Sequence, residues 1–174
     1  MGYTHYWKYN PNGIEDTEEL RKKFRKAVTI IDKAHKMIKK DTFLHKGQAG
    51  GCYDDVPCLI RGGLGEGTPM INESQVWFNG DEKSRNAHET FGIRWFEEVQ
   101  NTPLSPRGKH DFCKTARKPY DLLVCVALLA FKYAFHDPEV FTFSSDGHNS
   151  EWEPAKDLFT RITGSFVGKI FPEE

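Results

Sequence analysis

Phe112–Asp121 (FCKTARKPYD) holds the residue types best suited to binding an anion. Lys114, Arg117 and Lys118 stand directly before a predicted helix, where free N–H groups and the helix dipole favour negative charge. Arg117 could grip a phosphate with two parallel hydrogen bonds, Lys114 could add a point charge, and Thr115 a hydroxyl donor. The segment therefore predicts a phosphate site, and the alternative is a solvated basic loop.

A second candidate site is the turn SSDGH, at the end of a predicted strand from Val140 to Ser145. Asp146 could accept a hydrogen bond from a base edge or a ribose hydroxyl, and Ser144 and Ser145 could donate. Binding residues often lie on loops of this kind. An Asp-Gly pair is also typical of a plain turn, so both interpretations stay open.

The N-terminal segment YTHYW is rich in aromatic residues and predicts a strand. Alternation places Tyr3, His5 and Trp7 on one face and Thr4 on the other. An aromatic strand face can stack a nucleobase, for about 1–3 kcal/mol per base. The same face could instead belong to the core. Trp152, just after the SSDGH turn, has the same two alternatives.

An enzymatic interpretation uses Cys113 as a nucleophile. Its position near a helix N-terminus and basic residues could lower its pKa, with His110 or His5 as the base and Asp146 as a further working residue. Known catalytic spacings such as Gly-x-Ser-x-Gly and His-Glu-x-x-His are absent from the sequence. Binding without catalysis is therefore favoured, and a nucleotide- or phosphoester-processing enzyme is the alternative.

Metal and cofactor binding are not predicted. Cys52 and Cys58 are separated by five residues and His45 is nearby, but no second tight pair of ligands completes a structural zinc site. The four cysteines show no disulfide framework, and Cys125 lies in an apolar run typical of a buried thiol. That run, Leu122–Phe135, is too short to span a bilayer, so we expect a cytoplasmic protein.

Composition limits the partners further. The 174 residues fit one domain over 1–174, with 38% hydrophobic and 28% charged residues as in ordinary globular proteins. The formal net charge of −1 supplies no global field that would draw the chain onto DNA or a membrane. Any anion site must therefore be local, and long nucleic acids are not expected as partners.

A long amphipathic helix follows the first strand. Asp16 can cap it, and Glu19 can return a bond in the manner of a capping box. Its buried stripe recurs at helical spacing through Leu20, Phe24, Ala27, Val28, Ile31, Ala34 and Ile38. Its last turns carry Lys36, Lys39 and Lys40, where cations suit the helix dipole.

A second helix begins at Pro119, which suits a first turn, and is apolar on nearly all sides through Phe135. Further strands are predicted at Cys58–Arg61, Met70–Ile71, Gln75–Asn79, His88–Phe96 and Val140–Ser145, and a last helix at Glu153–Ile162. Strands and helices mix without a repeating βαβ period. We therefore expect an α+β fold, with a mixed or antiparallel sheet packed against the long N-terminal helix and the buried central helix.

Four segments spread along the chain, MGYTHYW, FCKTARKPYD, SSDG and EWEPA, resemble a family of small proteins encoded by bacteriophages. The chain is also similar to phage anti-CBASS sponge proteins. That resemblance implies a homo-oligomer, expected to be a tetramer, which binds cyclic oligonucleotide immune signals and withholds them from host effectors without cleaving them. It assigns no ligand residue by matched position.

The residues and the resemblance together predict a phage immune-evasion protein that sequesters a cyclic dinucleotide or a related nucleotide. The basic segment would hold phosphate, an aromatic ring would stack a base, and the serine-aspartate turn would read base or ribose edges. A protein–protein inhibitor that uses exposed aromatic residues as anchors is a further alternative. The expected ligand contacts are Tyr3, Thr4, His5, Trp7, Lys114, Thr115, Arg117, Ser144, Ser145, Asp146 and Trp152.

Overall fold

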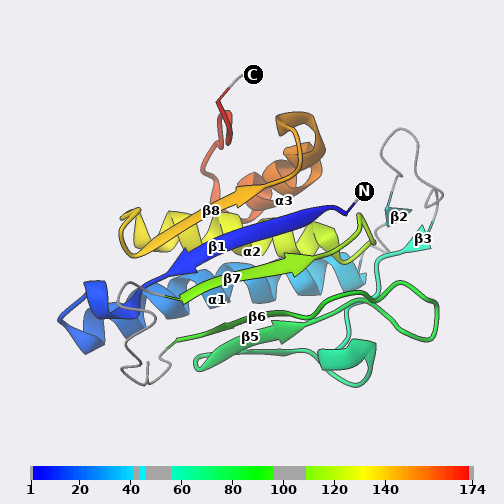
Figure 1. The fold of residues 1–174 in the computed structure, drawn as a ribbon, viewed down its shortest axis with the longest axis horizontal. Coiled ribbons are helices and arrows are strands. Elements are labelled where there is room, and N and C mark those ends of the chain that lie inside the picture. The colour runs from blue at the N-terminus through cyan, green and yellow to red at the C-terminus, as the bar shows by residue number, and fades with distance from the viewer. Residues whose placement is uncertain (1, 41–43, 46–55, 96–108, 173–174) are drawn as a thin grey trace.

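Within the described residues, three helices and two three-stranded antiparallel sheets make up most of the fold, which is the α+β arrangement that the sequence predicts (Figure 1). The structure is a computed structural model that describes residues 2–40, 44–45, 56–95 and 109–172. The first sheet has the order β7-β1-β8, and the second has the order β4-β5-β6. A separate short pair joins β2 (Leu44–His45) to β3 (Val56–Pro57).

The first sheet is centred on β1 (Thr4–Tyr9), with β7 (Lys109–Lys114) on one side and β8 (Phe141–Ser145) on the other. His5 lies opposite Cys113 in one pairing and opposite Ser145 in the other. The N-terminal strand therefore brings two distant segments of the chain together, and those segments are the two candidate loops of the sequence.

The strand β7 was not predicted, because the sequence analysis assigned no strand to residues 109–114. Phe112 is 55% exposed and Cys113 is fully buried, so the side chains alternate in the structure, but two adjacent apolar residues give no alternating pattern in the sequence. The antiparallel pairing with β1 makes this segment a strand, and such a long-range contact overrides a weak local pattern.

The helix α1 (Thr17–Lys40) buries the predicted apolar stripe, with Ile30 added to it. Asp16 caps the helix as predicted, since its Oδ1 accepts hydrogen bonds from the backbone N–H groups of Glu18 and Glu19 at 2.9 and 3.2 Å. The Glu19 carboxylate lies 3.0 Å from Lys23 in an i,i+4 ion pair.

The helix α2 (Asp121–Phe135) is the centre of the core. All of its residues are buried except Lys132 and Tyr133. It packs against α1, α3 (Glu153–Thr163) and β8. No helix among the described residues is both long and apolar enough to cross a membrane.

The second sheet contains β4 (Met70–Asn72), β5 (Gln75–Phe78) and β6 (Phe91–Arg94). Alternate residues of β5 and β6 face the core, among them Phe78 and Phe91, whose ring centroids lie 5.2 Å apart. The predicted strand at Cys58–Arg61 is reduced to a single bridge between Arg61 and Asn79. Three 3₁₀ turns complete the described elements: Pro11–Gly13, Gly63–Gly65 and Asn149–Trp152.

Candidate functional site

The three candidate segments of the sequence meet at one end of the first sheet. We call this region the strand-end junction, comprising residues 3–5, 114–118 and 144–151. The carbonyl of Tyr3 accepts hydrogen bonds from the backbone N–H groups of Thr115 and Ala116 at 3.1 and 3.3 Å. Thr4 donates its N–H to Oδ2 of Asp146 at 3.0 Å, and the N–H of Asp146 donates to the Thr4 carbonyl. The junction is therefore held together by groups that the sequence analysis assigned to a ligand.

Arg117 illustrates how the junction uses its polar groups. Its Nε donates to Oε1 of Glu151 at 2.8 Å, and its guanidinium lies 4.3 Å from the ring centroid of Tyr3. The hydrogen bond to Glu151 raises the pKa of Arg117. Both Ala116 and Arg117 have the left-handed backbone that L-residues adopt rarely, with φ of 51° and 55°. This backbone directs Arg117 toward an internal carboxylate.

The start of α2 is occupied by the protein's own carboxylate. Asp121 is buried in the first turn, and its Oδ1 accepts hydrogen bonds from the Thr115 hydroxyl at 2.6 Å and from Nε2 of His5 at 2.7 Å. Burial alone would raise the pKa of Asp121, but His5 and Thr115 hold it below its usual range. Asp121 thus takes the favourable place that the sequence assigned to a phosphate.

Lys118 is also engaged through its ammonium, and Lys114 is held through its backbone N–H. The backbone N–H of Lys114 donates to Oε2 of Glu89 at 2.6 Å, and Lys118 donates from Nζ to the carbonyl of Arg85 at 2.8 Å. Carboxylates from Glu89, Asp146 and Glu151 therefore lie among the basic side chains. Such mixing weakens the local positive potential that an anion site needs.

The aromatic face predicted to stack a base belongs to the core. Tyr3, Trp7 and Trp152 are 1%, 4% and 0% exposed. The Trp7 ring packs 4.9 Å from Phe91, and Trp152 stacks on Phe143 at 5.2 Å. The prediction of a stacking surface is wrong at these positions, because the sheet uses this face to cover the helices.

The serine-aspartate turn borders an open hollow of about 660 Å³, lined by Ser145, Asp146, Gly147, His148, Asn149, Ser150, Phe171 and Pro172. Ser144 is exposed on the strand before it. The Ser145 hydroxyl accepts from the N–H of Gly147 at 3.0 Å. Asn149 accepts from the N–H groups of Ile170 and Phe171. Many of the polar groups here form hydrogen bonds that hold the turn and the C-terminal segment in place.

Cys113 does not have the properties of a nucleophile. Burial raises its pKa, and its thiol donates to the carbonyl of Glu89 at 3.3 Å. His110 is three positions away on the same strand and is exposed on the opposite face, while His5 bonds Asp121. The prediction of a lowered pKa for Cys113 is wrong because burial raises it, and the carboxylates of Asp121, Glu89 and Asp111 act in the same direction.

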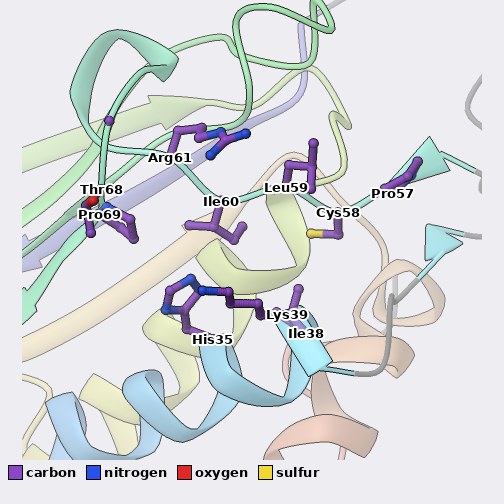
Figure 2. A pocket seen from close by; sticks show the side chains of 11 residues that line it. His35, Ile38, Lys39, Pro57, Cys58, Leu59, Ile60, Arg61, Thr68 and Pro69 are labelled. Atoms are coloured by element: carbon purple, nitrogen blue, oxygen red, sulfur yellow. The ribbon is translucent and has the colours of Figure 1, made fainter.

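A different hollow lies above the last turns of α1. We call it the α1 hollow; its volume is about 220 Å³ and it is lined by His35, Ile38, Lys39, Pro57, Cys58, Leu59, Ile60, Arg61, Gly67, Thr68 and Pro69. Figure 2 shows the side chains of α1 facing the segment from Pro57 to Arg61, with Thr68 and Pro69 at one side. The helix, the 57–61 segment and the loop before β4 therefore each supply one wall.

Cations and apolar groups are mixed in the α1 hollow. Ile38 and Ile60 are buried and provide an apolar floor. Lys39 is exposed, and no hydrogen bond or ion pair joins its ammonium to the described residues. Arg61 stands at the rim, where its Nε donates to Oδ1 of Asp81 at 2.6 Å and its side chain remains 44% exposed.

His35 is the titratable group of the hollow. Burial lowers its pKa, and Lys39 and Lys36 act in the same direction while Asp32 opposes them. At neutral pH the imidazole is therefore uncharged and offers one N–H donor and one nitrogen acceptor.

Sequence reasoning did not select the α1 hollow. Cys52 and residues 46–55 lie outside the described residues, so the Cys52–Cys58 pair is not placed. The lysines of the last helical turns were interpreted as complements of the helix dipole. His35 and Lys39 are spaced i,i+4 beside the buried Ile38, which could have marked a mixed cationic and apolar edge. The opposite wall is distant in sequence and carries no motif.

Comparison of the chain with models of known protein families, with curated proteins and with solved structures gives no match.

Proposed function

We propose that this protein binds and sequesters a small phosphorylated ligand of the cyclic nucleotide class, without cleaving it, and that the α1 hollow is the binding site. The observation that carries the proposal is the Lys39 ammonium, which has no partner among the described residues, beside the half-buried His35 over an apolar floor. An apolar surface with a few convergent polar groups is the usual composition of a small-molecule site. The ligand class rests on the resemblance to anti-CBASS sponges, and it suits this chemistry.

A phosphate at this position would contact Lys39, with the outer N–H groups of Arg61 on the facing wall of the hollow. The dipole of α1 opposes an anion at its C-terminal end, by about 0.3–1 kcal/mol. A charge-assisted hydrogen bond from Lys39 contributes about 1.5–3 kcal/mol and outweighs it. The base or sugar would lie on Ile38 and Ile60.

Binding without cleavage is supported by the thiol in the wall. The Cys58 thiol donates to the carbonyl of Pro119 at 3.0 Å, and burial raises its pKa to about 12. A thiol in this state supplies almost no thiolate at neutral pH. Among the residues that line the hollow, His35 is then the group best able to accept a proton, and the Cys58 thiol beside it is a poor nucleophile.

The size of the hollow bears on the assembly. About 220 Å³ is less than the roughly 300–1,000 Å³ of pockets that enclose drug-sized molecules. One copy of the chain would therefore cover part of a cyclic dinucleotide, and a second copy would cover the rest. In the expected homo-oligomer, a site shared between copies would also slow release, because closure over a ligand lowers the dissociation rate.

The test is capture from a panel of cyclic di- and oligonucleotides. The full chain is incubated with each compound, freed of unbound ligand, and denatured, and the released material is identified by mass spectrometry. We expect intact ligand from the wild type and a strong loss of capture in Lys39→Met. Lys33→Met is the matched control, because Lys33 is an exposed lysine of the same helix outside the hollow.

Three outcomes would overturn the proposal. Progressive turnover of the ligand would indicate an enzyme. Absence of capture across the panel would remove the ligand class and leave the protein–protein inhibitor. Capture that survives Lys39→Met but disappears in Arg117→Ala would move the site to the strand-end junction.

A further inference from the structure

Three buried side chains with metal-binding atoms meet beneath the strand-end junction. Nε2 of His5 lies 2.7 Å from Oδ1 of Asp121 and 3.8 Å from Sγ of Cys125, and that sulfur lies 3.6 Å from Oδ2 of Asp121. One ligand atom from each residue falls within 4.8 Å of the others. We propose that His5, Asp121 and Cys125 form a binding site for a divalent transition metal of the zinc type.

The fold fixes the three side chains from two rigid elements. Asp121 and Cys125 are spaced i,i+4 on α2, so both side chains project from one face of that helix. His5 lies on β1, which is hydrogen-bonded on both sides by β7 and β8. Sites built on helices and strands hold their geometry better than sites on loops.

The separations suit a zinc-sized ion. With zinc–ligand bonds of about 2.0–2.3 Å, tetrahedral ligand atoms lie about 3.3–3.6 Å apart. The Cys125 sulfur lies 3.8 Å from Nε2 of His5 and 3.6 Å from Oδ2 of Asp121, and both separations are close to this range. The other carboxylate oxygen, Oδ1, lies 2.7 Å from Nε2. If Oδ1 is the ligand instead, this pair would open by about half an ångström when an ion replaces the shared proton.

Charge balance favours a divalent ion at this depth. A carboxylate from Asp121, a thiolate from Cys125 and a neutral imidazole from His5 carry two negative charges together, which a divalent cation cancels. Buried charges are tolerated where they are paired or coordinate metals. The Thr115 hydroxyl, which donates to Oδ1 of Asp121 at 2.6 Å, supplies the outer hydrogen bond that orients a ligating carboxylate.

Without a metal, a buried ion pair between His5 and Asp121 would explain the close contact of these two side chains. It leaves two buried nitrogens without hydrogen-bond partners among the described residues: Nδ1 of His5 and Nε1 of Trp152. The two rings are neighbours, with centroids 5.4 Å apart. Unsatisfied buried polar groups are expensive. An ion bound to Nε2 of His5 would contact neither nitrogen, so these two atoms mark an incompletely satisfied part of the core and are not ligands of the proposed site.

The donor set selects the class of ion. Sulfur and imidazole nitrogen suit zinc and neighbouring transition metals, whereas calcium and magnesium require oxygen ligands. Three protein ligands leave one of zinc's four positions for another group, as in open zinc sites. Asp121 is the ligand nearest to solvent, with 10% of its side chain exposed.

Cobalt(II) is the probe, because it substitutes for zinc and gives a thiolate-to-metal absorption band. The full chain is stripped with a chelator, unfolded and refolded with cobalt(II), and titrated to completion. We expect a thiolate band that saturates at one equivalent, is displaced by zinc and is absent in Cys125→Ala. Cys113→Ala is the matched control, because it removes another buried thiol of the core outside the cluster.

Absence of a thiolate band in the refolded wild type would overturn the proposal without any variant. A band that persists in Cys125→Ala would place the metal on another cysteine and would also overturn it. Should Cys125→Ala fail to fold by circular dichroism, Cys125→Ser preserves the size of the site and is expected to shift the band out of the thiolate region. Ligand capture at the α1 hollow is measured separately, so the two proposals fail independently.

Discussion

The strand-end junction and the α1 hollow both contain cations, but they differ in what those cations contact. In the junction, Arg117 donates to Glu151, and the start of α2 is filled by Asp121. In the hollow, the Lys39 ammonium has no partner among the described residues. The residue types best suited to a ligand can therefore serve the fold instead. A binding site requires polar groups that the fold leaves unsatisfied beside an accessible cavity.

The largest expected effect comes from the buried carboxylate of the junction. Asp121→Ala leaves His5 and Thr115 without their shared acceptor. We expect the free energy of unfolding to fall by about 3–5 kcal/mol, as for other broken buried pairs. The measurement is urea denaturation in the presence of a chelator, so that bound metal does not contribute.

Asp157→Ala is the control for that prediction, because Asp157 is an exposed carboxylate on α3. Its effect should stay within about 0.5 kcal/mol. If Asp121→Ala were equally mild, the polar cluster of the junction would not be a stabilising part of the core.

The second prediction concerns binding at the hollow. Lys39→Gln removes the unpaired charge and should weaken ligand affinity by about 10–100-fold, the equivalent of one charge-assisted hydrogen bond. Lys39→Arg keeps the charge and should lose only a few-fold. Isothermal titration with a captured ligand measures both variants, and equal losses would show that shape rather than charge decides binding.

The stability of Lys39→Gln also distinguishes the α1 hollow from the strand-end junction. Lys39 is exposed and contacts no charged partner in the described part of the chain, so Lys39→Gln should change the free energy of unfolding by less than about 0.5 kcal/mol. A larger loss would mean that Lys39 serves the fold, in the way that the junction's polar groups do.

The third prediction concerns Arg117, whose removal should lower stability but leave ligand affinity nearly unchanged. Arg117→Ala removes the ion pair to Glu151 and the contact with the Tyr3 ring. Because the Arg117 side chain is 43% exposed, solvent screening limits the loss to about 1 kcal/mol. Ligand affinity should stay within about twofold, since a residue outside the site adds little to binding. A loss of affinity with unchanged stability would return the site to the junction.

The sequence was a good guide to elements and a poor guide to the site. The spacing of Leu20, Phe24 and Ile31 predicted the buried face of α1 because helical periodicity is a local signal. The same local reasoning failed for residues 109–114, because their strand is set by pairing with β1. The contacts that Arg117 and Trp152 make depend on residues far away in the chain. Local composition shows which chemistry a side chain can perform, and distant partners decide whether it is available.

The smallest expected effect is the pH dependence of the hollow, which depends on His35. Burial lowers its pKa from the ordinary value of 6.5. Lys39 and Lys36 on the same helix also lower the pKa, whereas Asp32 raises it. Arg61 faces His35 from the other wall of the hollow. A bound phosphate is negative and favours the protonated imidazole, so the bound form takes up a proton at a higher pH than the free protein does. Affinity should therefore rise by a few-fold as the pH is lowered from about 7.5 to about 5.5.

His35→Gln tests this origin of the pH dependence. The variant should bind with an affinity that is flat over the same range. The stability of the free protein has the opposite pH dependence. The unfolded chain takes up the His35 proton first, so the wild type loses stability as the pH falls below about 6.5, and His35→Gln should lose less. If the affinity of the wild type fell as the pH was lowered, the ligand's charged group would not lie near His35. The anion would then be held at the Arg61 rim or outside the α1 hollow.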